Sequence, residues 1–500
     1  MGLLADIRAN WNTTPIDTPL LCWEGGWSTR ADLLERCRRA AGLLRAHGLG
    51  PGDVVGLQAH RGPDFLAVFL GALGSGVTVL LLNGAYTPRE VGFLLSDAQA
   101  RVAVVQPSVC EALGDAACPL LSADVLAGAL DTAQPLPVDG DPDGLSVAAD
   151  AVAALGYTSG TTGQPKGAVI RHQNIAGTVA SLHRAWGWTS DDVLVHALPL
   201  FHIHGLFVAM LGALWAGARV VLLPRFSPDG AVAAMAQHGG TVFMGVPTFY
   251  HRLLGMDAPP ALPSMRLWTS GSAPLPAPVW EAFRDRFGCE ILERYGMTEV
   301  GIVLSNPLDG DRVPGTVGFP LPGVAGLITD RDTGEPLPAG QVGELQISSP
   351  GLISHYLGLP EKTAEAIRAD EAGQRWMRTG DLASCDASGR FSIVGRMGDM
   401  VITGGLNVYP REVETVLLDL SFVAEVAVVG VPDPDWGERV VALVVADGPA
   451  DEDAVLHHAK TELAGFKVPK EVRFADALPR NSMGKVQKHR IRSGWGARSA

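Results

Sequence analysis

Residues 151–167 read AVAALGYTSGTTGQPKG and join an apolar, strand-like run to a turn rich in glycine and hydroxyl groups. Residues 158–167 hold three glycines, four Ser or Thr side chains and one lysine. Glycine lets the backbone point several N–H groups at one anion, the hydroxyls add donors, and lysine supplies a positive charge. The stretch predicts a phosphate-binding loop, and its place between two apolar segments argues against a flexible surface loop. The common P-loop pattern, Gly-x-x-x-x-Gly-Lys-Ser/Thr, cannot be aligned with it.

Short apolar runs alternate with helical patterns through the first 290 residues. The strand-like runs are 54–59, 77–82, 101–105, 193–198, 219–223, 241–246 and 266–269, and the helical patterns include 30–47, 63–74, 173–186 and 278–287. This alternation predicts an α/β fold in which helices cover mainly parallel sheets. The uncharged stretch 206–218 is too short to span a bilayer and predicts a buried helix.

The pattern changes twice towards the end of the chain. From about residue 307, strands punctuated by Gly and Pro, such as 342–348, predict a small β-rich subdomain, and residues 133–150 before it predict a surface loop. After Arg396 come a hairpin-like stretch, a helix, two strands and a second helix, at 400–408, 410–420, 423–431, 440–446 and 451–464. We expect a large domain over 1–396 and a small α+β domain over 397–500.

Composition limits the possible functions. The chain has 500 residues, 47% of them hydrophobic, which exceeds what one core usually supports and predicts at least two domains. Its net charge of −14 argues against a nucleic-acid partner or an anionic membrane surface. Six cysteines without a Cys-x-x-Cys pair indicate neither zinc nor a disulfide framework. Asp6 interrupts the apolar region that a signal peptide needs, so we expect a cytoplasmic protein without membrane insertion.

Four further motifs follow the glycine-rich loop: ERYGMTE at 293–299, TGD at 379–381, GR at 395–396 and PRNSMGK at 479–485. In this order the motifs resemble those of the acyl-adenylate-forming superfamily, which includes acyl-CoA synthetases, and the resemblance spans roughly residues 20–490. It implies that a carboxylate attacks the α-phosphorus of ATP and forms an acyl-AMP, with release of pyrophosphate. The acyl group is then transferred to the thiol of CoA, and AMP leaves. The implied cofactors are ATP, Mg²⁺ and CoA.

The resemblance also implies a nucleotide site. The residues expected to hold the β- and γ-phosphates are Thr158, Ser159, Gly160, Thr161, Thr162, Gly163 and Lys166. Those expected around adenine are Gly271, Ser272, Ala273, Pro274, Glu293, Tyr295, Gly296 and Met297, with Tyr295 stacked on the base. Asp381 would accept hydrogen bonds from both ribose hydroxyls, and Arg396 would assist at the ribose or phosphate. In isolation Asp381 indicates a turn and Tyr295 a core residue, but the motif order favours the nucleotide roles.

Catalytic roles follow from the same resemblance. Thr298 would contact the α-phosphate, and Glu299 with Thr162 would hold Mg²⁺, which neutralises charge on the phosphates. Lys485 would bridge the attacking carboxylate and the α-phosphate. Its basic neighbours alone would indicate a solvated tail.

The small domain of such enzymes rotates between the two half-reactions. Rotation would carry Lys485 away and bring Gly404 and Gly405 towards CoA. The pivot, usually Asp or Lys, is Gly398 here. Glycine permits a large dihedral change but loses more entropy when it is fixed.

Arg294 departs from most relatives, which carry a small residue immediately before the Tyr-Gly-x-Thr-Glu motif. A guanidinium facing the acyl pocket needs a partner because an unpaired buried charge is costly. A second carboxylate on the substrate would supply one through two parallel hydrogen bonds. The alternative partner is Glu293 or another internal acid.

Further residues favour the same substrate class. His202, a candidate catalytic residue or gate, and His204 add polar donors beside the pocket, and Ser270 and Ile302 complete the candidate substrate contacts. The motifs ERYGMTE, FHIHGL and MGVPTFY together closely resemble those of malonyl-CoA synthetases. Whether methylmalonate is also accepted stays open, because one methyl group changes discrimination by only about 1–3 kcal/mol.

Three alternatives remain open from the sequence. The chain could be a CoA ligase for short-chain or aryl monocarboxylates, or an adenylation enzyme that loads a carrier-protein thiol. The lack of a Ser-bearing carrier domain before residue 500 favours free CoA. A nucleotide-binding protein without chemistry is disfavoured because Glu299 and Lys485 are both present.

Overall fold

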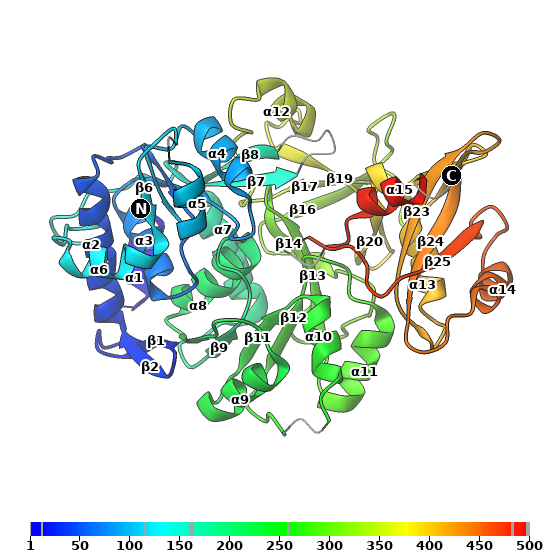
Figure 1. Ribbon diagram of the computed structural model, residues 1–500, viewed down its shortest axis with the longest axis horizontal. Coiled ribbons are helices and arrows are strands. Elements are labelled where there is room, and N and C mark those ends of the chain that lie inside the picture. The colour runs from blue at the N-terminus through cyan, green and yellow to red at the C-terminus, as the bar shows by residue number, and fades with distance from the viewer. Residues whose placement is uncertain are drawn as a thin grey trace.

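Strands and helices alternate along the first 297 residues, which confirms the expected α/β class. The computed structural model describes residues 2–11, 14–114, 116–159, 165–257, 260–481 and 485–496. Figure 1 shows a large body of helix-covered sheets that continues into a smaller lobe formed by the orange and red C-terminal elements.

The first sheet has six strands in the order β6-β5-β3-β4-β7-β8, and all neighbours except β7 and β8 run parallel. Its strands are β3 (Val54–Leu57), β4 (Thr78–Leu81), β5 (Val102–Val105), β6 (Leu120–Ser122), β7 (Val152–Ser159) and β8 (Pro165–Arg171). Helices α4 (Pro88–Asp97) and α5 (Pro107–Ala112) pack on one face, where Leu80 points, whereas Val79 points into the core on the other face. This two-sided burial explains the continuous apolar runs.

The second sheet has nine strands in the order β15-β14-β13-β12-β11-β9-β10-β1-β2. They are β1 (Pro19–Trp23), β2 (Gly26–Thr29), β9 (Val193–His196), β10 (Arg219–Leu222), β11 (Val242–Gly245), β12 (Leu267–Ser270), β13 (Ile291–Met297), β14 (Gly301–Ser305) and β15 (Phe319–Pro320). One shared core lies between the two sheets and includes α1 (Leu3–Asn10), α2 (Arg30–Ala46), α3 (Pro63–Gly74), α6 (Leu126–Thr132), α7 (His172–Trp186) and α8 (Leu211–Ala216). The outer face carries α9 (Pro228–His238), α10 (Pro247–Leu254) and α11 (Ala277–Phe287).

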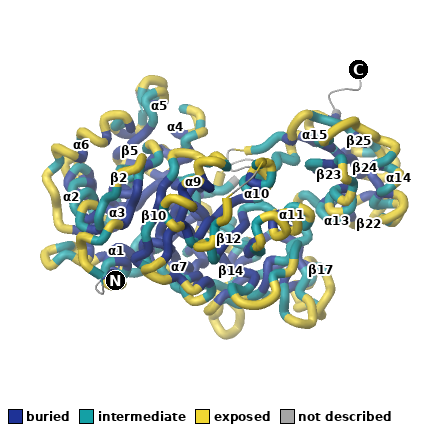
Figure 2. The backbone as a smooth tube through the Cα atoms, turned by 90° about the horizontal axis from the view of Figure 1, so that it is seen from below, coloured by how far each residue is buried: buried dark blue, intermediate teal, exposed yellow. Residues whose placement is uncertain are grey.

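Two smaller units follow. The β-rich subdomain contains β16 (Ala325–Thr329), β17 (Val342–Ser348), α12 (Pro360–Ala366), β18 (Ile367–Ala369), β19 (Arg375–Cys385) and β20 (Phe391–Arg396). The C-terminal unit contains β21 (Val401–Thr403), β22 (Leu406–Val408), α13 (Pro410–Leu417), β23 (Val423–Asp433), β24 (Gly437–Ala446), α14 (Glu452–Glu462), β25 (Glu471–Phe474) and α15 (Lys488–Gly496). Its two hydrophobic clusters draw on residues 401–495 alone, and Figure 2 shows it as a separate lobe with its own buried strands.

Two local expectations change. The buried helix expected over 206–218 is a π-helical turn, His204–Met210, followed by α8. A Cβ atom on Gly205 would lie 2.0 Å from the Pro199 carbonyl oxygen, so only glycine allows this close approach. Residues 133–150 contain no helix or strand, as expected for a loop, but Val138 and Val147 are buried in the domain rather than lying on the surface.

Within the described ranges, none of the helices combines the length and apolar character that crossing a bilayer requires. All six cysteines are free thiols.

Candidate active site

The phosphate-loop strand and the 293–299 motif meet where β7 and β13 end. The Thr158 hydroxyl donates a hydrogen bond of 2.9 Å to Oε1 of Glu299. Thr298 packs directly over β7, because a Cβ atom on Gly156 would lie 2.9 Å from its Cγ2 atom. The fold therefore joins two motifs that are about 140 positions apart in the sequence.

Part of the predicted loop lies outside the described residues. Gly160, Thr161, Thr162 and Gly163 lie outside the described residues, and only the backbone of Ser159 is described. At the other end of the loop, Lys166 pairs in register with Thr158 across β7 and β8.

Tyr356 is a residue that the sequence reasoning missed. Its hydroxyl donates to Oε1 of Glu299 at 3.1 Å, and the Lys166 ammonium lies 4.7 Å from the centre of its ring. No recognised motif surrounds Tyr356, so no local signal marked it.

The expected ribose site combines β13 with the β-rich subdomain. Asp381 is buried, and its Oδ1 atom lies 2.6 Å from Nε of Arg396. The Tyr295 hydroxyl donates to Oδ2 of the same carboxylate. Burial raises the pKa of Asp381, whereas Arg396 and Tyr295 oppose the rise. The structure thus brings all three predicted residues together.

Residues 271–274 follow β12 and form the expected wall beside the 293–297 segment. Ser272 adopts a left-handed backbone, with φ of 68°, and its hydroxyl lies 3.1 Å from Nδ1 of His204. The Leu275 N–H, just after this wall, donates to Oε1 of Glu293 at 3.0 Å. Of the rest of the predicted nucleotide set, Ala273 and Pro274 lie on this wall, and Gly296 and Met297 lie at the end of β13.

The predicted acyl-pocket residues also gather here. Arg294 is 4% exposed, and its Nε and Nη2 atoms have no hydrogen-bond partner among the described residues. The same is true of the Ser270 hydroxyl and of Nε2 of His204. Ile302 is buried and packs on Gly296, where a Cβ atom would lie 2.7 Å from its Cδ1 atom.

The electrostatics of this cluster are dominated by positive charge. Burial lowers the pKa of Arg294 to about 9. Burial, Lys485 and Arg294 together lower the pKa of His202 to about 3, so its ring is neutral at physiological pH. Among the described residues, Arg294 takes part in no ion pair with an Asp or Glu side chain. The cluster is therefore suited to an anion.

Lys485 reaches this site from the C-terminal domain. Figure 1 shows the red segment before α15 running from the C-terminal lobe towards the large body. Loss of surrounding water and the charge of Arg396 lower the pKa of Lys485, while Asp381 and Glu299 oppose this. Gly404 and Gly405 lie elsewhere, in the exposed turn between β21 and β22, with φ of 56° and 77°.

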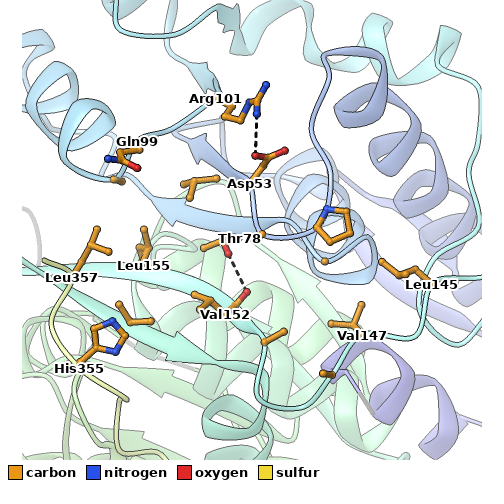
Figure 3. A pocket seen from close by; sticks show the side chains of 18 of the residues that line it. Asp53, Thr78, Gln99, Arg101, Leu145, Val147, Val152, Leu155, His355 and Leu357 are labelled. Atoms are coloured by element: carbon orange, nitrogen blue, oxygen red, sulfur yellow. Dashed lines mark hydrogen bonds and ion pairs between the residues drawn. The ribbon is translucent and has the colours of Figure 1, made fainter.

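A cavity of about 760 Å³ lies against the first sheet and is separate from the candidate site. Leu155 of β7 and Val169 of β8 line it, together with His355 and Leu357, and the Asp53–Arg101 ion pair is part of its lining (Figure 3). Its lining residues include none of the predicted site residues.

Comparison with known families identifies the family of the chain. The family described as AMP-binding enzyme matches residues 7–357, and the AMP-binding enzyme C-terminal domain matches residues 412–485. The chain therefore belongs to the AMP-binding enzyme family. It is an acid–thiol ligase that uses ATP and CoA.

Individual relatives differ in the acid they use. A feruloyl-CoA synthase from Amycolatopsis sp is 37% identical over 478 residues, which is 94% of each chain. A sulfoacetate–CoA ligase from Cupriavidus necator is 36% identical over 98% of this chain and 96% of its own. The mitochondrial malonate–CoA ligase ACSF3 from Mus musculus is 39% identical over 68% of this chain and 64% of its own. The crystal structure of ATP-bound MatB from Rhodopseudomonas palustris is 40% identical, covers 99% of both chains and superposes with a TM-score of 0.92.

Proposed function

We propose that the chain is an ATP-dependent malonyl-CoA synthetase, which converts malonate, ATP and CoA into malonyl-CoA, AMP and pyrophosphate. The observation that carries this proposal is the buried guanidinium of Arg294, with two nitrogen atoms unpartnered among the described residues. A guanidinium binds a carboxylate through two parallel hydrogen bonds, so the distal carboxylate of malonate supplies the missing partner.

The relatives support a small acid with a second anionic group. Malonate carries a second carboxylate and sulfoacetate a sulfonate, and ligases for both are among the similar proteins. Ferulate carries neither, although its synthase is equally similar overall. Overall similarity does not separate these acids, whereas a buried unpaired charge favours the dianions.

The proposed reaction gives each of the predicted groups a role. One oxygen of the near carboxylate bonds to the α-phosphorus while the bond to pyrophosphate breaks. Lys485 and Thr298 would stabilise the charge that develops there. The CoA sulfur then bonds to the acyl carbon, and AMP leaves. Tyr295 and Asp381 would hold the adenine and ribose during both steps.

The site also fits Mg²⁺. Glu299 offers a carboxylate, and Thr162 would offer a hydroxyl, both oxygen ligands of the kind that Mg²⁺ prefers. Within the part of the chain that the structure describes, no cluster of three or more His, Cys, Asp or Glu side chains could hold a metal. Mg²⁺ commonly binds through one or two protein ligands plus substrate phosphates, so a sparse site is consistent with it. When bound, the ion would neutralise charge on the phosphates.

A panel of acids tests the substrate. Release of pyrophosphate and AMP is measured with and without CoA for malonate, methylmalonate, sulfoacetate, acetate, benzoate and ferulate. We expect the highest kcat/KM with malonate, and CoA-dependent formation of the thioester. A preference for acetate, benzoate or ferulate would establish the monocarboxylate alternative. Transfer to a carrier protein in preference to CoA would establish the carrier-loading alternative.

Two variants test the role of Arg294. Arg294→Ala removes the charge, and Arg294→Met removes it while keeping the volume of the side chain. We expect kcat/KM for malonate to fall about a hundredfold in both, from the loss of hydrogen bonds to a charged group. Activity with acetate should stay unchanged, and Arg294→Met should raise the melting temperature because it removes an unpaired buried charge. Unchanged malonate kinetics in both variants would contradict the proposal.

A further inference from the structure

The segment 353–357 ties the phosphate-loop strand to the turn that carries Glu299. On one side, the Leu357 N–H donates to the Gly167 carbonyl at 2.7 Å and the Val169 N–H donates to the His355 carbonyl at 3.0 Å. On the other side, the Ile353 N–H donates to the Glu299 carbonyl at 2.9 Å. The segment is therefore fixed to both parts of the expected metal and phosphate site.

Tyr356, which belongs to this segment, contacts Glu299 and Lys166, two charged side chains of that site. Its hydroxyl donates to Oε1 of Glu299, which also accepts from Thr158. Its ring lies 4.7 Å from the Lys166 ammonium, within the range of a cation–π interaction. Tyr356 is only 3% exposed, so these contacts are shielded from water.

The chemistry of these contacts is specific. A phenol hydroxyl has one proton to donate, and that of Tyr356 is directed at Oε1 of Glu299. Because Tyr356 and Thr158 both donate to Oε1, they fix the plane of the Glu299 carboxylate. The aromatic face limits where the flexible Lys166 side chain can go.

We propose that Tyr356 is a positioning residue for Mg·ATP. Its hydroxyl orients Glu299, and its ring holds Lys166. This inference rests on the proposed roles of Glu299 and Lys166 in binding Mg·ATP. It is independent of which acid the enzyme activates.

The chain offers a matched control in the same segment. His355 and Leu357, on either side of Tyr356, line the separate cavity (Figure 3), whereas Tyr356 does not. Alternate residues of an extended segment face opposite ways, so His355→Ala changes the segment without touching Glu299 or Lys166.

Calorimetric titration of ATP into the enzyme, with no acid present, tests the proposal. Tyr356→Phe keeps the ring and loses the hydroxyl. We expect it to need about tenfold more Mg²⁺ for half-maximal ATP binding, from the loss of a hydrogen bond to a charged group. Its affinity for ATP in EDTA should equal that of the wild type. Tyr356→Leu also loses the ring, and its affinity for ATP in EDTA should fall about threefold, because the Lys166 contact is lost.

Three results would overturn the proposal. The first is an unchanged Mg²⁺ requirement in Tyr356→Phe, and the second is equal affinity for metal-free ATP in Tyr356→Leu and the wild type. The third is a loss of ATP affinity in His355→Ala as large as the loss in the Tyr356 variants. Melting temperatures of all variants establish that the compared proteins are folded. Failure of every acid in the substrate panel would contradict the malonate assignment and leave this test unaffected.

Discussion

Glu293 and Arg294 are consecutive residues of β13, and both are buried. Successive side chains of a strand point to opposite faces, which separates the two charges. Glu293 accepts a hydrogen bond from the Leu275 N–H, whereas the Arg294 guanidinium packs against Gly271, where a Cβ atom would lie 2.4 Å from its Cζ atom. The alternative in which Glu293 neutralises Arg294 is therefore wrong, and strand geometry is the reason.

The buried carboxyl of Glu293 predicts a pH dependence of stability. Burial raises its pKa from 4.5 to about 7, opposed by the Leu275 N–H and the charge of Arg411. Between these values the folded protein holds a proton that the unfolded chain has lost, so this group makes stability fall as pH rises from about 4.5 to about 7. Glu293→Gln lacks this titration. From pH 5 to pH 8, its free energy of unfolding should therefore rise by about 2–3 kcal/mol relative to that of the wild type.

Equilibrium unfolding in urea at several pH values measures this difference. The comparison at pH 5, where Glu293 is protonated in the folded protein, serves as the control for the effect of the amide itself. Parallel stability curves for the two proteins would contradict the prediction.

At the scale of elements, β7 and the turn after β13 approach each other so closely that only glycine fits between them. An alanine at position 156 would place its Cβ atom 2.9 Å from Thr298. We expect Gly156→Ala to slow adenylate formation by about a hundredfold, because a displacement of about 1 Å at reacting groups has that effect. Release of pyrophosphate measures the rate.

Gly128→Ala in α6 is the matched control, since a Cβ atom there meets nothing within 4 Å. It should leave adenylate formation unchanged. If Gly156→Ala formed the adenylate at the wild-type rate, the contact between β7 and Thr298 would have no part in catalysis.

At the scale of the whole molecule, the proposed site includes a residue from each of the two expected domains. Lys485 comes from the C-terminal domain, and its charge acts on Asp381, Glu299 and Arg294 of the large domain. Gly404 and Gly405 lie in an exposed turn of the same small domain. A rotation about Gly398 that exchanges Lys485 for Gly404 and Gly405 at the site stays a prediction.

Lys485→Ala should separate the two half-reactions. Adenylate formation should fall by at least about a hundredfold, because a charge that stabilises the transition state is lost. Thioester formation from supplied acyl-AMP should remain near the wild-type rate. The two rates are measured as pyrophosphate release and as CoA thioester formation.

Arg490→Ala is the control for loss of one positive charge from the same tail, where the Arg490 guanidinium contacts Gln487. It should leave both half-reactions unchanged. An equal loss in both half-reactions of Lys485→Ala would refute the assigned role.

The layered fold and the motif series could be predicted from the sequence because their signals are local. Apolar runs of strand length report burial on both faces of a parallel sheet. Likewise, the chemistry of the motifs can be recognised from a few consecutive residues. Examples are the glycines, hydroxyls and lysine of 158–167 and the residues of 293–299. The π-helical turn at His204–Met210 was not predictable, because it depends on the contact between Gly205 and the Pro199 backbone.

By itself, the sequence determined the fold class, the order of the motifs and the presence of an arginine before the 295–299 stretch. The folded chain was needed to see that Arg294 lacks an acidic partner among the described residues and that Tyr356 contacts Glu299 and Lys166. Whether a buried charge is paired depends on which side chains the fold brings to one place. Tyr356 and Glu299 are 57 positions apart, and residue types along the chain do not report such proximity.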